Sequence, residues 1–417
     1  MTDLPVNSIC VIGLGYIGLP TAIIFASHGV QVTGVDISDR HVDAVNRGEL
    51  PFVEEGLDVV LADVVGKGLL KAQKDTPEAD VYIVAVPTPF AEGHKADVSY
   101  IEAAAKSLAP KLKQGNLVVL ESTSPPGTTE HMADVILAER PDLSADGADG
   151  KPIIHFAHAP ERVLPGRIMV ELAANDRVLG GTTPEATELA RKVYAIFCTG
   201  ELLTTDARTA EMAKLTENSF RDVNIAFANE LSVICSRMGI DVWELIELAN
   251  HHPRVNILQP GPGVGGHCIA VDPWFIVSAA PEESRLIHTA RNVNDEKPDW
   301  VIDKVLSAVE GNDAPTIAAL GLAFKADIDD LRESPAVAIT KKLAERLPQA
   351  KVLAVEPNVT ELPRQLAGLD NVELADFDQA VAAADVVLLL VDHKQFKACD
   401  RAALEGKQVV DTRGTWR

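Results

Sequence analysis

The sequence predicts an α/β protein with two doubly wound domains, joined by a long central helix and a small helical domain. A strand, a glycine-rich turn, a helix and a second strand follow one another near the N-terminus, and the same order returns in the last third of the chain. Such alternation is typical of a parallel sheet with helices on both faces. At 417 residues the chain is also too long for one hydrophobic core, so two or three domains are expected.

The first strand and turn carry a dinucleotide-binding pattern. Residues 8–28 read as a strand, a GxGxxG turn and a helix, and the glycines are Gly13, Gly15 and Gly18. Glycines in this turn let the backbone approach a pyrophosphate at the helix N-terminus. The next strand ends in Asp36, at a spacing that suits an acid binding the adenosine ribose hydroxyls. The order predicts a Rossmann-like domain, and the acid favours NAD.

Further cofactor contacts are expected beside this turn and at the ends of later strands. Residues 79–89 and 117–128 read as buried strands that run into loops rich in Thr and Pro. In a doubly wound sheet such loops lie at the carboxyl edge, where the cofactor binds. Arg40 fits the pattern of a solvated helix residue equally well, and threonine is also common in turns and helix caps. The expected contacts are Tyr16, Ile17, Arg40, Thr88, Thr123 and Thr129.

The last third of the chain repeats this order with a changed turn. Residues 316–325 read as a strand and turn, and the following strand ends in Glu356. The turn keeps Gly321 but then carries Lys325 and Arg332 in place of further glycines. Ammonium and guanidinium groups bind anionic oxygens, so we expect a second Rossmann-like domain for a different phosphorylated ligand.

Residues 206–238 have a long helical pattern, with Asp206 as a possible cap and Gly239 as a stop. Because of their i, i+4 and i+7 spacing, Lys214, Asn218 and Arg221 share one polar face. This face is either solvated or turned toward a cleft. On the opposite face, core or subunit contacts are expected from Leu215, Val223, Phe227, Leu231 and Ile234.

Composition argues against several classes of protein. The net charge of −23 opposes binding to nucleic acid and to anionic membranes. Apolar runs such as residues 386–391 are too short to span a bilayer, and the first residues lack the pattern of a signal peptide. Five scattered cysteines without CxxC pairs indicate neither a disulfide framework nor a metal site. We therefore expect a cytoplasmic protein without metal, nucleic acid or membrane partners.

One cysteine lies in a glycine-rich segment. Residues 261–275 read GPGVGGHCIAVDPWF, with Cys268 after the glycines and Asp272 four positions later. Glycine backbone lets a substrate approach closely, and a thiol in such a loop is reachable. A single cysteine is more often buried and inert. Together with the dinucleotide pattern, however, the segment predicts an oxidation through a covalent thioester.

Seven segments resemble the UDP-glucose/UDP-N-acetylmannosamine dehydrogenase family, namely VIGLGYIGLP, AVPTP, ESTSPPGT, APERVLPG, AEMAKLTENSFRDVNIAFANE, HPRVNILQPGPGVGGHCIAVDPWF and GLAFKADIDDLRESPA. The likeness covers essentially the whole chain. It implies an NAD-dependent UDP-sugar 6-dehydrogenase that oxidises UDP-N-acetyl-D-mannosamine to UDP-N-acetyl-D-mannosaminuronate, by two hydride transfers without release of the aldehyde. The same reaction on UDP-N-acetylglucosamine or UDP-glucose is the alternative, and the product would serve polysaccharide biosynthesis.

The resemblance also implies three domains and an assembly. Residues 1–204 are expected to bind NAD, residues 205–300 to form a central helical and dimerisation region that carries catalytic residues, and residues 301–417 to bind UDP. A homodimer or higher homo-oligomer is expected through the central helices, with Arg254 acting across the interface.

By the same resemblance, five residues carry the chemistry. Cys268 adds to the aldehyde and forms a thiohemiacetal, and Glu161 orients or activates the water that hydrolyses the thioester. Lys214 moves a proton and stabilises the developing alkoxide, while Asn218 donates a hydrogen bond to the same oxygen. Asp272 helps the proton transfer or holds the lysine. The plain alternatives are a salt bridge for the glutamate and a helix cap for the aspartate.

The substrate is expected to contact residues of the same motifs, which are Arg162, Val163, Lys214, Asn218, Arg221, His252, Arg254, Gly265, Lys325 and Arg332. His267 is expected to affect specificity or structure, because neighbouring side chains need not face each other. A redox-neutral isomerase, epimerase or dehydratase would commonly use Tyr-x-x-x-Lys, a pattern that no tyrosine of this chain completes. A non-catalytic nucleotide-binding regulator would not need a thiol, a lysine and carboxylates together.

Overall fold

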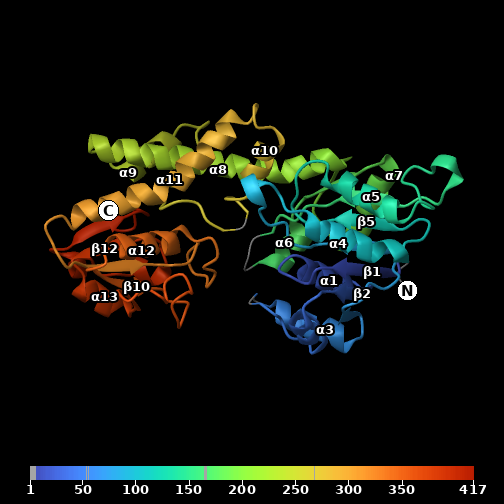
Figure 1. Cartoon of the computed structure of the whole chain (residues 1–417), viewed down its shortest axis with the longest axis horizontal. Coiled ribbons are helices and arrows are strands. Elements are labelled where there is room, and N and C mark those ends of the chain that lie inside the picture. Colours follow the sequence, from blue (N-terminus) through green and yellow to red (C-terminus); the bar gives the residue numbers. More distant parts are fainter. Residues whose placement is uncertain (1–5, 53, 55, 164–166, 267) are drawn as a thin grey trace. The chain divides into compact units, whose positions relative to one another are not determined.

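The computed structural model describes residues 6–52, 54, 56–163, 167–266 and 268–417. The chain divides into two compact units, unit 1 (Met1–Glu217) and unit 2 (Asn218–Arg417) (Figure 1). The predicted α/β fold is confirmed, since each unit contains a largely parallel sheet covered by helices. In the described part of the chain, no helix is long and apolar enough to cross a membrane.

Unit 1 contains an eight-stranded sheet of order β3-β2-β1-β4-β5-β6-β7-β8. The strands from β3 to β6 are parallel in the order of a doubly wound fold, whereas β7 pairs antiparallel with β6 and parallel with β8. The strands are β1 (Ser8–Ile12), β2 (Gln31–Val35), β3 (Leu70–Gln73), β4 (Val81–Val84), β5 (Leu117–Leu120), β6 (His155–His158), β7 (Arg177–Gly181) and β8 (Leu202–Asp206).

Helices cover both faces of this sheet. Because successive side chains of a strand point to opposite faces, Ile9 and Val11 pack with α1, α3 and α7, while Cys10 and Ile12 pack with α4 and α5. The helices of unit 1 are α1 (Gly18–Ser27), α2 (Asp39–Asn46), α3 (Leu57–Gly66), α4 (Ser99–Leu108), α5 (Thr128–Glu139), α6 (Ile168–Ala174) and α7 (Pro184–Tyr194). Short 3₁₀ turns are η1 (Glu92–His94), η2 (Ala109–Lys111) and η3 (Ala148–Gly150).

Unit 2 contains a five-stranded parallel sheet of order β11-β10-β9-β12-β13. Helices α11 and α12 cover one face of it and α13 covers the other (Figure 1). The strands are β9 (Thr316–Leu320), β10 (Lys351–Val355), β11 (Val372–Leu374), β12 (Val386–Leu389) and β13 (Gln408–Asp411). The helices are α9 (Val242–Asn250), α10 (Asp272–Ala279), α11 (Arg285–Ala308), α12 (Pro335–Arg346), α13 (Phe377–Ala383), α14 (Lys394–Lys397) and the 3₁₀ turn η4 (Arg401–Leu404).

The long helix α8 (Ala207–Met238) contributes residues to both units. Its predicted ends are confirmed. Asp206 accepts the backbone N–H of Thr209 at 2.9 Å, which satisfies one of the free amides of the first turn. Gly239 follows the last turn with φ +69°, a conformation that glycine adopts without strain.

Candidate functional site

Glycine occupies the three positions of the first turn for different structural reasons. At Gly13, with φ +94°, a Cβ would lie 2.5 Å from the carbonyl oxygen of Ala85, and at Gly18 it would lie 1.9 Å from that of Gly13. Packing of the turn therefore requires both. At Gly15, by contrast, a Cβ would meet no described atom of the chain within 4 Å. Gly15 thus keeps space open before α1, where the helix N-terminus favours a phosphate.

Asp36 directly follows β2 and is tied to this turn. Its Oδ2 accepts the backbone N–H of Leu14 at 2.8 Å, and its Oδ1 accepts that of Ser38 at 2.8 Å. His41 Nδ1 lies 3.3 Å from Oδ2, and the carboxylate remains 12% exposed. A carboxylate offers about four lone-pair positions, so acceptor capacity remains for ribose hydroxyls. The residues of this turn fit a dinucleotide.

The expected threonine contacts occupy different environments. Thr88 donates its hydroxyl to the carbonyl oxygen of Thr123 at 2.6 Å, which joins the loops after β4 and β5. Thr129 is fully buried, and both its hydroxyl and its N–H donate to Glu211, at 2.6 and 2.7 Å. The hydroxyl of Thr129 is therefore already used within the chain, whereas Thr88 and Thr123 remain half-buried at the sheet edge.

Glu211 caps α5 from a distant segment, a role that the sequence analysis missed. It also accepts the N–H of Gly127 at 2.5 Å, so its carboxylate lies at the positive end of the helix. Burial raises the pKa of Glu211. Near the cofactor turn, Tyr16 donates its hydroxyl to Glu54 at 2.9 Å, Ile17 is half-buried, and Arg40 is exposed on α2.

Glu161 belongs to a buried group of charges, the Glu161 cluster, which comprises Glu121, Glu161 and Arg177. Arg177 Nη2 donates to Glu161 Oε2 at 2.8 Å, and its Nη1 lies 3.5 Å from Glu121 Oε1. The second oxygen of Glu161 accepts the N–H of Arg162 at 2.6 Å. The three side chains are 7% exposed or less. Arg177 therefore fixes the orientation of the Glu161 carboxylate.

Glu121 lies behind Arg177 at the end of β5. It accepts hydrogen bonds from Thr21 at 2.8 Å and Tyr194 at 3.2 Å. Burial raises the pKa of Glu121 to about 7, although Arg177 acts in the opposite direction. An acidic residue at the end of an apolar strand was the sequence signal for this site, but its partner Arg177 is 56 residues away.

The glycine loop before Cys268 packs against the chain itself. A Cβ at Gly265 would lie 2.4 Å from the carbonyl oxygen of Glu333, and Gly266, with φ +82°, would place one 3.2 Å from the ring of Phe324. Glycine is therefore needed at these positions for internal packing, a reason that the sequence did not reveal. Cys268 itself is exposed, whereas His267 lies outside the described residues.

Two expected catalytic residues meet within unit 2. Asp272 begins α10, and its N–H donates to the carbonyl oxygen of Cys268 at 2.9 Å. Its carboxylate accepts a hydrogen bond from Asn218 Nδ2 at 2.5 Å, and the two residues are 3% and 6% exposed. Lys214 is half-buried and precedes Asn218 by one turn of α8.

The expected substrate contacts are mostly accessible side chains. Arg162 is held by Glu217 at 2.5 Å and by the carbonyl oxygen of Asp176. Arg332 forms a forked pair with Asp330, at 2.8 and 2.6 Å, and its side chain is 64% exposed. Val163 packs at the edge of the unit 1 core. The other exposed members of the set are Arg221, His252, Arg254 and Lys325.

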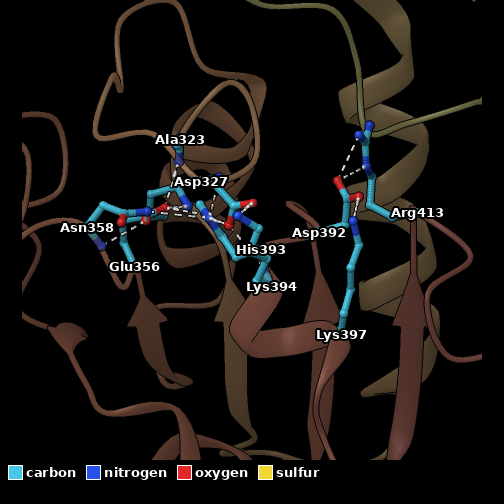
Figure 2. A network of polar contacts seen from close by, with 10 residues as sticks. Ala323, Asp327, Glu356, Asn358, Asp392, His393, Lys394, Lys397 and Arg413 are labelled. Atoms are coloured by element: carbon cyan, nitrogen blue, oxygen red, sulfur yellow. Dashed lines mark hydrogen bonds and ion pairs between the residues drawn. The ribbon is translucent and has the colours of Figure 1, made fainter. Parts of the chain in front are cut away.

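The second glycine turn repeats the first but uses its acid, Glu356, differently; Figure 2 shows this glutamate among its polar contacts. Gly321 has φ +90° and donates to Val355 O at 2.8 Å, as Gly13 does to Val35 O. Glu356 Oε2 accepts the N–H groups of Leu322 and Ala323 at 2.8 and 2.9 Å and also contacts His393 at 3.0 Å. Both oxygens are occupied, since Asn358 donates to Oε1 at 3.0 Å. This acid fixes the turn from inside.

Arg413 is a further cation beside the glycine loop that the sequence analysis missed. It pairs with Asp392 at 2.9 Å, which in turn contacts Lys397 at 2.6 Å (Figure 2). A Cβ at Gly261 would lie 2.7 Å from Arg413 Nη1. Its position at the end of β13, the carboxyl edge of a parallel sheet, was the available signal.

Comparisons with protein families match three successive parts of the chain. Residues 7–198 match the NAD binding domain of the UDP-glucose/GDP-mannose dehydrogenase family. Residues 208–296 match the central domain of this family, and residues 318–417 match its UDP binding domain.

Individual relatives are similar over their full length. The UDP-N-acetyl-D-mannosamine dehydrogenase of Salmonella typhi is 57% identical over 420 residues, covering 99% of both chains. The NDP-N-acetyl-D-galactosaminuronic acid dehydrogenase of Ralstonia nicotianae is 55% identical over 415 residues, covering 99% of this chain and 97% of its own. The solved structure of UDP-D-ManNAc dehydrogenase from Pyrococcus horikoshii has a TM-score of 0.86 and 38% identity, over 98% of this chain and 96% of that one.

Proposed function

The chain belongs to the UDP-glucose/GDP-mannose dehydrogenase family, and from this premise we propose that it oxidises C6 of UDP-N-acetyl-D-mannosamine to the carboxylate. The predicted NAD cofactor and the predicted class of UDP-sugar dehydrogenase are confirmed by the family. The observation that carries the proposal is the exposed Cys268 just before α10, whose first residue, Asp272, is held by Asn218. NAD, when bound, accepts the hydride in each of the two oxidation steps.

The NAD-binding role is proposed for the first turn of unit 1. Gly15 leaves the space for the pyrophosphate, the N-terminus of α1 favours its charge, and Asp36 accepts from the ribose hydroxyls. Thr88 and Thr123, joined at the edge of the sheet, are proposed to border the nicotinamide end.

In the first oxidation, the C6 alcohol loses a proton and a hydride to give the aldehyde. We assign the proton to Lys214, which also stabilises the developing alkoxide, and a hydrogen bond to the same oxygen to Asn218. The contact between Asn218 and Asp272 orients the amide, so that its N–H groups point in defined directions. Asp272 thereby acts on the reaction through its neighbour.

In the second oxidation, the Cys268 thiolate adds to the aldehyde carbon and forms a C–S bond. The protonated adduct is a thiohemiacetal, which loses a proton and a hydride to give a thioester. Water then attacks the thioester carbon, the C–S bond breaks, and the thiolate is regenerated. Overall, one alcohol, one water and two NAD⁺ yield one carboxylate, two NADH and three protons.

Glu161 is proposed to orient the hydrolytic water. Arg177 and the Arg162 amide each occupy one lone pair of its two oxygens, which leaves acceptor positions for a water molecule. The residue is 7% exposed, so the position is nearly closed to bulk solvent. A purely structural salt bridge is the competing role, and it predicts unchanged hydrolysis in an isosteric Glu161→Gln variant.

We also propose a homodimer that pairs through α8. Phe220, Phe227 and Ile234 are spaced by seven residues and are 68%, 53% and 43% exposed. Side chains at this spacing share one face of a helix, and an exposed apolar stripe of this kind favours a second helix as partner. Phe227 and Ile234 thus lie outside the core of the single chain. We further propose that the enzyme acts in the cytoplasm, because its five cysteines are scattered along the chain without CxxC pairs.

The second candidate is the same oxidation on UDP-N-acetylgalactosamine, because the Ralstonia nicotianae relative is called an NDP-N-acetyl-D-galactosaminuronic acid dehydrogenase. The test is a substrate panel with purified protein and NAD, containing these two UDP-sugars, UDP-N-acetylglucosamine and UDP-glucose. We expect UDP-N-acetylmannosamine to have the highest kcat/KM and to yield two NADH per sugar. Preference for the galactosamine substrate would replace the first candidate, and one NADH per sugar would overturn the two-step oxidation.

A further inference from the structure

A cavity in unit 2 lies between α8, α9, α11 and β13 and has a volume of about 370 Å³. None of the residues to which the proposed reaction assigns a role lines it. This volume lies within the range of cavities that hold small molecules. Its polar and aromatic walls are formed mainly by Ser232, Trp243, Lys297, Trp300, Lys304 and Thr412.

The most unusual group in this cavity is the ammonium of Lys297, a residue that is 4% exposed. Its Nζ donates to Ser232 Oγ and lies 3.8 Å from the ring centre of Trp300. Among the described residues, no carboxylate oxygen lies within 4.0 Å of this nitrogen. Buried charges in proteins are normally paired, so Lys297 lacks the usual anionic partner.

The other charged groups at the cavity do not supply this partner. Lys304, whose Nζ lies 5.2 Å from the same Trp300 ring, adds a second positive charge. Asp241 Oδ1 accepts the N–H groups of Trp243 and Glu244, at 2.8 and 3.1 Å, and so caps α9.

Asp411 is used in the same way. Its Oδ1 accepts the N–H groups of Arg413 and Gly414, and its Oδ2 accepts that of Trp416, each at 2.8 Å. In contrast, the buried indole N–H of Trp243 has no hydrogen-bond partner. The cavity therefore has a spare donor and positive charge, while both oxygens of Asp411 and one oxygen of Asp241 already accept hydrogen bonds.

We propose that this cavity binds a small organic anion, with its carboxylate or phosphate group against Lys297 and Trp243 and its remaining atoms beside Trp300. Lys304, which is exposed, attracts the anion at the entrance. The site is tied to the glycine loop, because Ser232 donates to Asn229 O at 2.6 Å and Asn229 Oδ1 accepts the N–H of Gly261 at 2.9 Å.

Binding at this site should depend on pH. Burial, aided by Lys304, lowers the pKa of Lys297 to about 7. An anion beside the amine favours its charged form, so binding above this pH takes up a proton. We expect affinity to rise about tenfold per pH unit between pH 9 and pH 7 and to level off below.

The test is titration calorimetry on the full chain with inorganic phosphate and, separately, malonate. NAD and UDP are present at saturation, so that the proposed nucleotide sites are filled. Lys297→Met keeps the volume of the side chain but removes its charge. Lys341→Met, at an exposed lysine of α12, is the matched control. Should Lys297→Met fail to fold, Trp243→Phe removes the unpartnered N–H while keeping an aromatic ring at this position.

We expect at least one probe to bind, with proton uptake at pH 9 and with affinity at least tenfold weaker in Lys297→Met or Trp243→Phe than in Lys341→Met. Saturation by phosphate alone would assign a phosphorylated ligand, and saturation by malonate alone would assign a carboxylate. If neither probe binds, or if both bind Lys297→Met as tightly as the parent, the lysine is structural and the proposal is wrong.

Discussion

Replacing Glu121 by Gln tests the electrostatics of the Glu161 cluster. The pKa of Glu121 is raised from 4.5 to about 7, mainly by burial. Because the folded state holds this proton more tightly, the stability present at acid pH is lost as the pH rises from 4.5 through 7. The difference corresponds to about 3 kcal/mol, at about 1.4 kcal/mol per pKa unit. Glutamine keeps the shape and one acceptor oxygen, for either Thr21 or Tyr194, but does not titrate.

The assay is urea unfolding at intervals from pH 4.5 to pH 8.5, followed by circular dichroism. All four tryptophans lie in unit 2, so their fluorescence would not report on this cluster. We expect the free energy of unfolding of Glu121→Gln to fall less than that of the parent over this range, by up to about 3 kcal/mol. Glu139→Gln, at an exposed position of α5, serves as the control. Parallel curves for Glu121→Gln and the parent would refute the raised pKa.

Three further variants test other parts of the structure. Gly15→Ala should fold normally but bind NAD at least tenfold more weakly, whereas Gly18→Ala, with a Cβ 1.9 Å from Gly13 O, should give little folded protein. Calorimetry measures the affinity for NAD and expression yield measures folding, and equal behaviour of the two variants would contradict the proposed role of Gly15. Phe227→Glu should convert the proposed dimer to a monomer in light scattering, and a dimer mass for this variant would place the interface elsewhere. In the parent, the free energy of unfolding should rise from pH 7 to 10.5, because Lys297 is deprotonated in the folded state but still protonated in the unfolded state. Lys297→Met should abolish that rise in urea unfolding, and a rise that persists in this variant would be due to other groups.

The features that could be predicted from the sequence are those that depend on local patterns. The GxGxxG turn, the acid at the end of β2 and both ends of α8 each depend on residues close together in the chain. Glycine conformation, helix capping and strand periodicity act over a few residues, so a single sequence is enough to reveal them. The repeated order in the last third was visible for the same reason.

The contacts that build the site depend on sheet order, which the sequence did not reveal. Glu121 and Glu161 follow β5 and β6, and Arg177 begins β7, which returns antiparallel beside β6 and so brings the guanidinium to both carboxylates. Glu211 reaches α5 from α8 in a similar way. The missing information was which strands are neighbours and in which direction they run.

The burial of Lys297 is a second feature that could not be predicted from the sequence. The residue lies in a charged segment that reads as a solvated helix surface, yet it is 4% exposed because α8 and β13 cover that side of α11. Whether a charged side chain is buried depends on elements far away in the sequence.

The most direct test of the proposed chemistry is intact-protein mass spectrometry of Glu161→Gln, quenched in acid after mixing with NAD and UDP-N-acetylmannosamine. We expect slowed hydrolysis to leave the sugar acyl group attached to the protein, with the modified peptide containing Cys268, and no such adduct in a Glu161→Gln/Cys268→Ala double variant. Turnover to two NADH per sugar by Cys268→Ala alone would show that the carboxylate forms without a bond to this sulfur.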